Sequence, residues 1–384
     1  MRARFPPGPL SLTNSAHPTP AVKRERHFHI GEGGDFMSDN RALSVVLICR
    51  QAVRFNYLFL ALTAQLRQAQ PMHALPPLPL PSSDVPVLPP WLARQKPAGS
   101  AAEAAFAAGA ALQALDGLVR TAPAWAGAWR QRLALKSAAA AARRLGRPEG
   151  QSELRDATHL RLRGEALGPG GEICEAFARL ARRPPGLDER ELQEIVALLG
   201  LRWHTEFAAL PGALAGLDKT SEPPPFAAAA LAARVVAPEA EVLAFWLAEL
   251  GLARALRWPF AVPLLTAQML GPAFRPNETS RLRPGSPGFE RALCGALVAS
   301  VGPALSLARE IAAHAARLAA AAPKIRVRGA GEVIALLLNE DAVVGTLRTP
   351  TLTRWATRRL FQRLVEFGAV REFSGRAAFK LYGI

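Results

Sequence analysis

The spacing of apolar residues constrains the fold of this chain more than any other feature. From Ser100 onward, apolar side chains recur at intervals of three and four, and the series is interrupted where proline or glycine occurs. No alternation of strand and helix patterns runs through this part, so a parallel nucleotide-binding sheet is not expected. Alanine supplies much of the apolar content, which also favours helices. We therefore predict a mainly all-α protein.

Changes in texture divide the chain into four segments. Residues 1–71 are proline-rich at the start and have little periodicity, and they are predicted to be a disordered or mis-assigned leader. A proline-rich lead-in (72–99), an all-helical body (100–323) and a winged-helix-like domain (324–384) follow. Our hypothesis is that the natural product begins at Met72, which opens directly onto the lead-in.

Capping residues and prolines define the predicted helices of the body. Ser100 is a good N-cap for the first helix, and a second should follow Pro123. Further helices are predicted at about 150–160, 170–182, 188–200, 203–217, 225–235, 239–256, 260–270 and 287–321, the last with a break at Gly302-Pro303. Six large side chains should be buried in this body: Phe106, Leu112, Trp129, Leu133, Phe245 and Trp246.

The C-terminal segment has a different pattern. Residues 330–339 have the apolar density of a short helix, a loop follows, and residues 351–367 form an amphipathic helix. Two short strands, 369–373 and 377–382, are predicted next. The apolar members of the amphipathic helix are Leu352, Trp355, Leu360, Phe361, Leu364 and Phe367. Helix, loop, basic helix and β-hairpin together have the order of a small winged helix-turn-helix domain.

Basic charge is denser in this segment than elsewhere in the folded part. The chain has a formal net charge of +16, and residues 324–384 hold 11 Lys and Arg against five Asp and Glu. Such an excess suits a phosphate-backbone partner such as double-stranded DNA. The predicted nucleic-acid contacts are Arg354, Arg358, Arg359, Arg363, Arg371, Arg376 and Lys380. The alternative is a solvated arginine face on a domain that packs against the body or against a protein partner.

No motif indicates catalysis, a cofactor or a metal site. The histidines form no HExxH pattern, and the chain has no GxSxG and no GK[ST] sequence. Its three cysteines, Cys49, Cys174 and Cys294, are too far apart for a CxxC pair and odd in number for a disulfide framework, so a reducing, cytoplasmic compartment is expected. No segment is a convincing membrane span. We expect a non-enzymatic protein without catalytic, cofactor-binding or metal-binding residues.

Charged residues of the first helices form a second candidate cluster. A polar network between these helices could contain Asp116, Arg130, Arg132, Lys136, Arg155 and Asp156. Buried ion pairs that fix helix register are the ordinary interpretation of such a network. A ligand-binding or enzymatic role for the same residues is the alternative.

Several segments resemble one bacterial family. They are residues 125–138 (WAGAWRQRLALKSA), 154–157 (LRDA), 194–196 with 199–203, 257–259 with 262–265, and the ending from 358–361 to 381–383. This set resembles the family catalogued as domain of unknown function 1403, and the resemblance implies no particular activity. A fainter similarity is to the helical and winged-helix flanks of Fic-type nucleotidyl transferases. The chain lacks an HPFxxGNGR-like loop, so AMP transfer is not implied.

Three functions follow from these patterns. The first is a DNA-binding accessory or regulatory protein whose body forms homo-oligomers or senses another protein. The second is a protein-interaction scaffold whose C-terminal domain only packs against the body. The third is an enzyme that uses the region of Asp116, Arg130, Arg132 and Lys136.

Overall fold

Capping side chains set the first residues of several helices. The Ser100 hydroxyl accepts a hydrogen bond from the backbone N–H of Glu103, and the Glu103 carboxylate accepts one from the N–H of Ser100. This reciprocal pair is a capping box. Asp188 acts in the same way by accepting a hydrogen bond from the N–H of Glu191 at 2.8 Å. The prediction that Ser100 caps the first helix of the body is confirmed.

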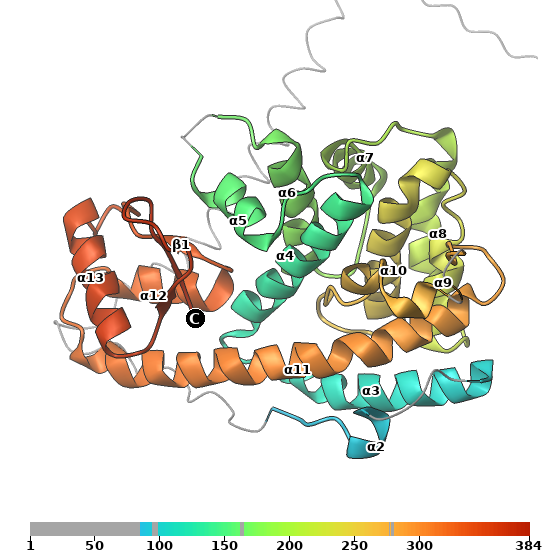
Figure 1. The fold of residues 1–384 in the computed structure, drawn as a ribbon, viewed down its shortest axis with the longest axis horizontal. Coiled ribbons are helices and arrows are strands. Elements are labelled where there is room, and N and C mark those ends of the chain that lie inside the picture. The colour runs from blue at the N-terminus through green and yellow to red at the C-terminus, as the bar shows by residue number, and fades with distance from the viewer. Residues whose placement is uncertain (1–84, 94–98, 162–164, 276, 278–279) are drawn as a thin grey trace, which may run out of the picture. The chain divides into compact units, whose positions relative to one another are not determined.

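The computed structural model describes residues 85–93, 99–161, 165–275, 277 and 280–384, which belong to one compact unit, His73–Ile384. The predicted leader and most of the lead-in lie outside these residues. The described part is mainly helical, as predicted (Figure 1). Its helices are α2 (Pro90–Ala93), α3 (Ala101–Thr121), α4 (Ala126–Arg144), α5 (Gln151–His159), α6 (Gly168–Arg182), α7 (Glu189–Leu198), α8 (Leu210–Gly216), α9 (Pro224–Ala232), α10 (Glu241–Ala255), α11 (Phe289–Ala321), α12 (Ala330–Asn339) and α13 (Arg354–Glu366).

The long helix α11 connects the two ends of this unit. Its first part packs against α9 and against α3, which lies beside it, and its last part extends to α12 and α13 (Figure 1). Trp129 of α4 is fully buried, and its indole N–H donates a hydrogen bond to the carbonyl of Ala304 in α11. Trp246 of α10 makes the equivalent bond to the carbonyl of Ala176 in α6. The two tryptophans therefore fix helices to one another through both apolar contact and a satisfied N–H.

Small side chains form the first half of the buried face of α3. Ala104, Ala108 and Ala111 are almost completely buried, whereas Phe106 is 69% exposed and stacks on Trp91. Phe106 is two residues from Ala104 and from Ala108, so it lies on the opposite side of the helix. The prediction of a buried Phe106 was therefore wrong. The other five side chains expected in the core are buried: Leu112, Trp129, Leu133, Phe245 and Trp246.

The helix predicted at 260–270 does not form. After Phe260 the chain forms no regular element except a 3-10 turn at Thr266–Gln268. Pro263 removes a helix donor in the middle of this segment. The buried Glu249 carboxylate of α10 also accepts hydrogen bonds from the N–H groups of Leu264 and Thr266, each at 2.9 Å. The backbone donors that a helix would use internally are bound to a side chain instead.

Helix α11 continues through Pro303, where a break was predicted. Its packing on α3, α4 and α9 outweighs the loss of one backbone hydrogen bond. Within the described residues, one helical stretch, Phe289–Lys324, is long and apolar enough to cross a membrane by length and composition. Of the most apolar 18 residues of this stretch, 61% are buried inside the protein, as expected for a core helix.

The strands of the described residues all lie in the C-terminal segment. They are β1 (Val343–Val344), β2 (Arg371–Glu372) and β3 (Leu381–Gly383), in the antiparallel order β1-β3-β2. The predicted hairpin is present as β2 and β3, but its strands are shorter than expected. Strand β1 was predicted as loop, because two valines are too few for a visible alternation.

We expect Glu249→Leu to lower the free energy of unfolding by about 2–5 kcal/mol, because two buried N–H groups lose their acceptor. Burial raises the pKa of Glu249 to about 7, although the hydrogen bonds from Leu264 and Thr266 oppose this shift. The contribution of the protonated side chain is therefore complete below the usual value of 4.5 and is lost as the pH rises through about 7. The destabilisation should be larger at pH 5 than at pH 8.

Urea unfolding followed by circular dichroism measures this difference. The control is Glu366→Leu, which changes an exposed glutamate and should alter stability by at most about 0.5 kcal/mol. Equal effects of the two substitutions would contradict the role assigned to Glu249.

Candidate functional site

Helix α13 presents its arginines to solvent because its apolar face is packed. Leu360, Phe361 and Leu364 are completely buried, and the ring of Phe361 stacks on Tyr382 of β3 at a centroid distance of 4.4 Å. The hydroxyl of Thr353 caps the first turn by accepting the N–H of Ala356. Four predicted contact residues are exposed on the rest of the helix: Arg354, Arg358, Arg359 and Arg363. None of the four has a carboxylate partner among the described residues.

The other three predicted contacts are already paired. Arg371 forms an ion pair with Glu310 of α11, and Arg376 forms one with Asp156 of α5. Lys380 binds Glu372 on the neighbouring strand at 2.8 Å. The structure therefore separates the seven residues into a free set on α13 and a set bound to carboxylates. Two members of the second set attach the C-terminal segment to the body.

A groove of about 340 Å³ runs beside the first half of α13. Arg354, Trp355 and Arg358 line it from the helix, and the loop before β3 contributes Phe379 and Lys380. Trp355 is 72% exposed and Phe379 is 61% exposed. We expected Trp355 on the apolar face of the helix, and that prediction was wrong. Phe361 follows Trp355 by six positions, which places the two side chains about 120° apart on the helix.

A buried charge cluster holds the C-terminal segment against α4 and α5. Asp341 accepts hydrogen bonds from Arg132 of α4 and, at 2.6 Å, from Nε of Arg155 of α5. Arg132 also donates to the backbone carbonyls of Asp341 and Ile384. Both guanidinium groups lie 4.6 Å from the ring centre of Phe373. Burial raises the pKa of Asp341, but the charges and hydrogen bonds of the two arginines outweigh burial and hold this pKa below its usual value.

The network predicted between the first helices is present only in part. Arg132 is buried and Arg155 is half-buried, but their shared partner is Asp341, far along the chain. Asp116 instead accepts the indole N–H of Trp258, and the Arg130 guanidinium lies over the ring of Phe260. Lys136 is half-buried, and Asp156 pairs with Arg376. Because Asp341 lies 209 residues from Arg132 and 186 from Arg155, the local spacing of residues gives no sign of this partner.

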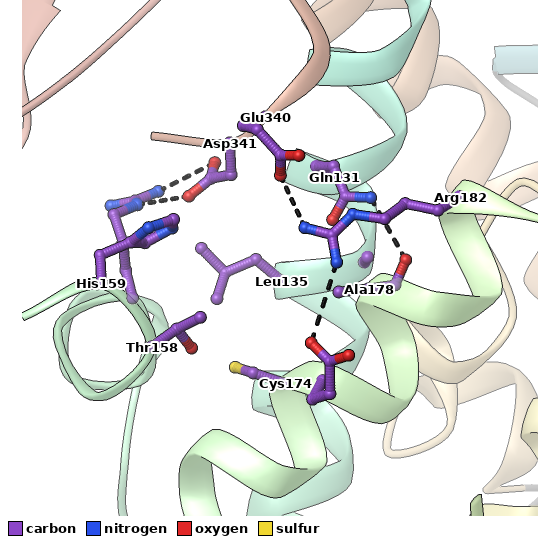
Figure 2. A pocket seen from close by; sticks show the side chains of 12 residues that line it. Gln131, Leu135, Thr158, His159, Cys174, Ala178, Arg182, Glu340 and Asp341 are labelled. Carbon is purple, nitrogen blue, oxygen red and sulfur yellow. Dashed lines mark hydrogen bonds and ion pairs between the residues drawn. The ribbon is translucent and has the colours of Figure 1, made fainter. Parts of the chain in front are cut away.

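A small pocket of about 50 Å³ lies beside this cluster (Figure 2). Figure 2 shows Asp341 and His159 at one side, Cys174 below, and Arg182 reaching Glu340 at the other. Burial lowers the pKa of His159 and raises the pKa of Cys174 to about 12. Both side chains are therefore neutral at pH 7, and Cys174 is no thiolate nucleophile. The space suits a few water molecules and is well below the roughly 300 Å³ of small ligand pockets.

The described residues contain no group of three or more His, Cys, Asp or Glu side chains that could hold a metal ion. Cys174 and Cys294 are buried free thiols. A family model described as "Protein of unknown function (DUF1403)" matches residues 80–384. The chain belongs to the DUF1403 family.

The match covers both the helical body and the C-terminal segment of this DUF1403 protein. The resemblance to this family drawn from the sequence is confirmed. No curated protein and no solved structure matches the chain significantly. The fainter similarity to the flanks of Fic-type proteins is not shown by these comparisons and stays a prediction.

We expect Asp341→Asn to destabilise this DUF1403 protein by about 3–5 kcal/mol, because the buried Arg132 and the half-buried Arg155 would lose their counter-charge. The matched control is Asp156→Asn, which breaks the pair with the 55% exposed Arg376 and should change stability by about 0–1 kcal/mol.

The same pair of variants has a pH dependence that chemical unfolding can measure. Because the folded-state pKa of Asp341 lies below 3.8, its contribution is present above that value and is lost as the pH falls through the folded-state pKa. Wild type and Asp341→Asn should therefore converge in stability on strong acidification. A constant difference from pH 7 down to pH 2 would contradict the charge-based explanation.

Proposed function

We propose that this DUF1403 protein is a non-enzymatic nucleic-acid-binding protein that contacts double-stranded DNA through the exposed face of α13. One observation carries the proposal: Arg354, Arg358, Arg359 and Arg363 share the solvent face of one helix and have no carboxylate partner among the described residues. Arginine side chains in this arrangement suit contacts with phosphates and guanine edges.

The order of elements in the C-terminal segment supports the same proposal. Helix α12 precedes β1, α13 follows, and β2 and β3 complete an antiparallel sheet with β3 in the centre. We propose that this is a small winged helix in which α13 is the recognition helix. The buried stack of Phe361 on Tyr382 fixes α13 on that sheet and turns the opposite face outward. A rigid base of this kind suits a helix that enters the major groove.

The pairing of charges also favours α13 over the hairpin as the main contact. Arg371 and Arg376 are bound to Glu310 and Asp156, so a phosphate would have to compete with those carboxylates. The arginines of α13 face no such competition. We therefore infer that the hairpin orients the domain while α13 supplies the affinity.

An interaction scaffold is the second candidate function, and the same ion pairs are the observation that favours it. They join the C-terminal segment to α11 and α5, as packing without DNA contact would require. The exposed apolar side chains of Val87, Trp91 and Phe106 would then belong to a protein-binding surface. We further propose a cytoplasmic location, in agreement with the buried free thiols of Cys174 and Cys294.

We expect the double variant Arg354→Ala/Arg358→Ala to bind a duplex DNA more weakly without loss of folding. If both side chains contact phosphates, the slope of log affinity against log salt concentration should flatten by roughly two. Fluorescence anisotropy with a labelled duplex at several salt concentrations measures both quantities.

A matched control is Arg202→Ala/Arg234→Ala, which removes the same charge from exposed positions of the body. This control should leave the salt slope unchanged. The proposal fails if the two double variants bind alike, and the scaffold would then be the better interpretation.

A further inference from the structure

Two aromatic side chains are exposed at one groove of the C-terminal segment. Trp355 lies in the first turn of α13 and Phe379 in the loop before β3, and both line the groove of about 340 Å³. Their exposed fractions of 72% and 61% leave most of each apolar ring in water. Neither ring is needed for the core, which at this place consists of Phe361 and Tyr382. Exposed aromatic side chains at a concave surface indicate a binding site.

The backbone of Phe379 supports this interpretation independently. Its φ angle is 57°, in the left-handed region that side chains other than glycine rarely adopt. Ala377 and Ala378, which precede it in the same loop, are exposed and add little bulk to the groove. The loop thus holds a strained residue while leaving space in front of its ring. Strain of this kind is concentrated at functional sites.

The charges around the groove define what it can bind. Arg354 and Arg358 line it and have no carboxylate partner in the described part of the chain. Lys380 also lines the groove and forms an ion pair with Glu372. Arg359 follows Trp355 by one turn of the same helix. A ligand for this surface must therefore offer flat apolar faces together with negative charge. Nucleic acids with accessible bases meet both requirements, because aromatic rings stack on bases while cations bind phosphates.

We propose that this groove binds unpaired bases of single-stranded nucleic acid, stacked on Trp355 and Phe379, with the adjoining phosphates bound by Arg354 and Arg358. This inference rests on the proposed function of α13 and adds single strands to the nucleic acids that it binds. In a duplex, the faces of the bases are covered by their neighbours and only edges and phosphates can be contacted. The two exposed rings therefore distinguish single strands from duplexes, whereas the arginines contribute to binding of both.

The test compares two probes on the full-length protein by fluorescence anisotropy: a labelled oligothymidylate and a labelled duplex of equal length. Trp355→Ala and Phe379→Gly each remove one ring, and glycine tolerates the backbone angle at position 379. Each substitution should weaken binding of the single strand about five- to hundred-fold. Binding of the duplex should change by less than about three-fold, since no base face is available to the rings.

Trp91→Ala is the matched control, because Trp91 is also an exposed tryptophan but lies in α2. It should alter neither affinity. Removal of a ring should leave the salt dependence of single-strand binding unchanged, whereas Arg354→Ala should flatten its slope by about 0.7. Thermal unfolding of each variant verifies that the fold is retained.

The outcomes separate this inference from the proposed function. If the duplex binds through α13 while Trp355→Ala and Phe379→Gly leave single-strand binding unchanged, the inference is wrong and the proposed function stands. If neither probe binds and polyglutamate binds instead, the groove receives an acidic protein and both are wrong. Selective loss of single-strand binding in the ring variants, with Trp91→Ala unaffected, supports the inference.

Discussion

Asp341 between the guanidinium groups of Arg132 and Arg155 is the interaction on which the C-terminal segment depends. One carboxylate, that of the buried Asp341, binds both the buried Arg132 and the half-buried Arg155. Hydrogen bonds to the carbonyls of Asp341 and Ile384 satisfy further donors of Arg132. The ring of Phe373 provides the remaining contact through its negative face. Since a buried cation without partners is very unfavourable, the segment has one position in which all these groups are satisfied.

The position of α13 follows from this cluster through short steps along the chain. Strand β1 begins two residues after Asp341 and pairs with β3, where Tyr382 stacks on Phe361 of α13. The apolar face of α13 is thereby fixed towards the sheet, and its arginines point away. The ion pairs of Arg371 and Arg376 act in the same direction, because they use the basic side chains of the hairpin to hold the segment on the body. The same contacts therefore attach the C-terminal segment to the body and expose the arginines of α13.

Helix positions were largely predictable because they depend on local chemistry. Ser100, Pro123 and the loop prolines act on their immediate neighbours, and the structure places helix boundaries close to them. The errors arose where distant groups decide the outcome. Glu249 binds the N–H groups of Leu264 and Thr266 and prevents a helix whose apolar pattern looked adequate. Phe106 was assigned to the core by its size, although the buried positions around it on α3 are alanines, and α3 packs on α11.

The candidate site was predictable in its charge but not in its shape. Arginines on an amphipathic helix are visible in the sequence, whereas the carboxylates that bind Arg371 and Arg376 come from helices far along the chain and leave no trace in local spacing. The exposure of Trp355, in contrast, could have been predicted from the sequence. At about 100° per residue, Trp355 lies about 120–180° from Leu360, Phe361 and Leu364, so it cannot share their buried face. Solvation alone accounts for an exposed arginine, but it does not account for an exposed tryptophan. An aromatic residue that lies outside the apolar face of its helix is therefore a better indicator of a binding surface than the arginines beside it.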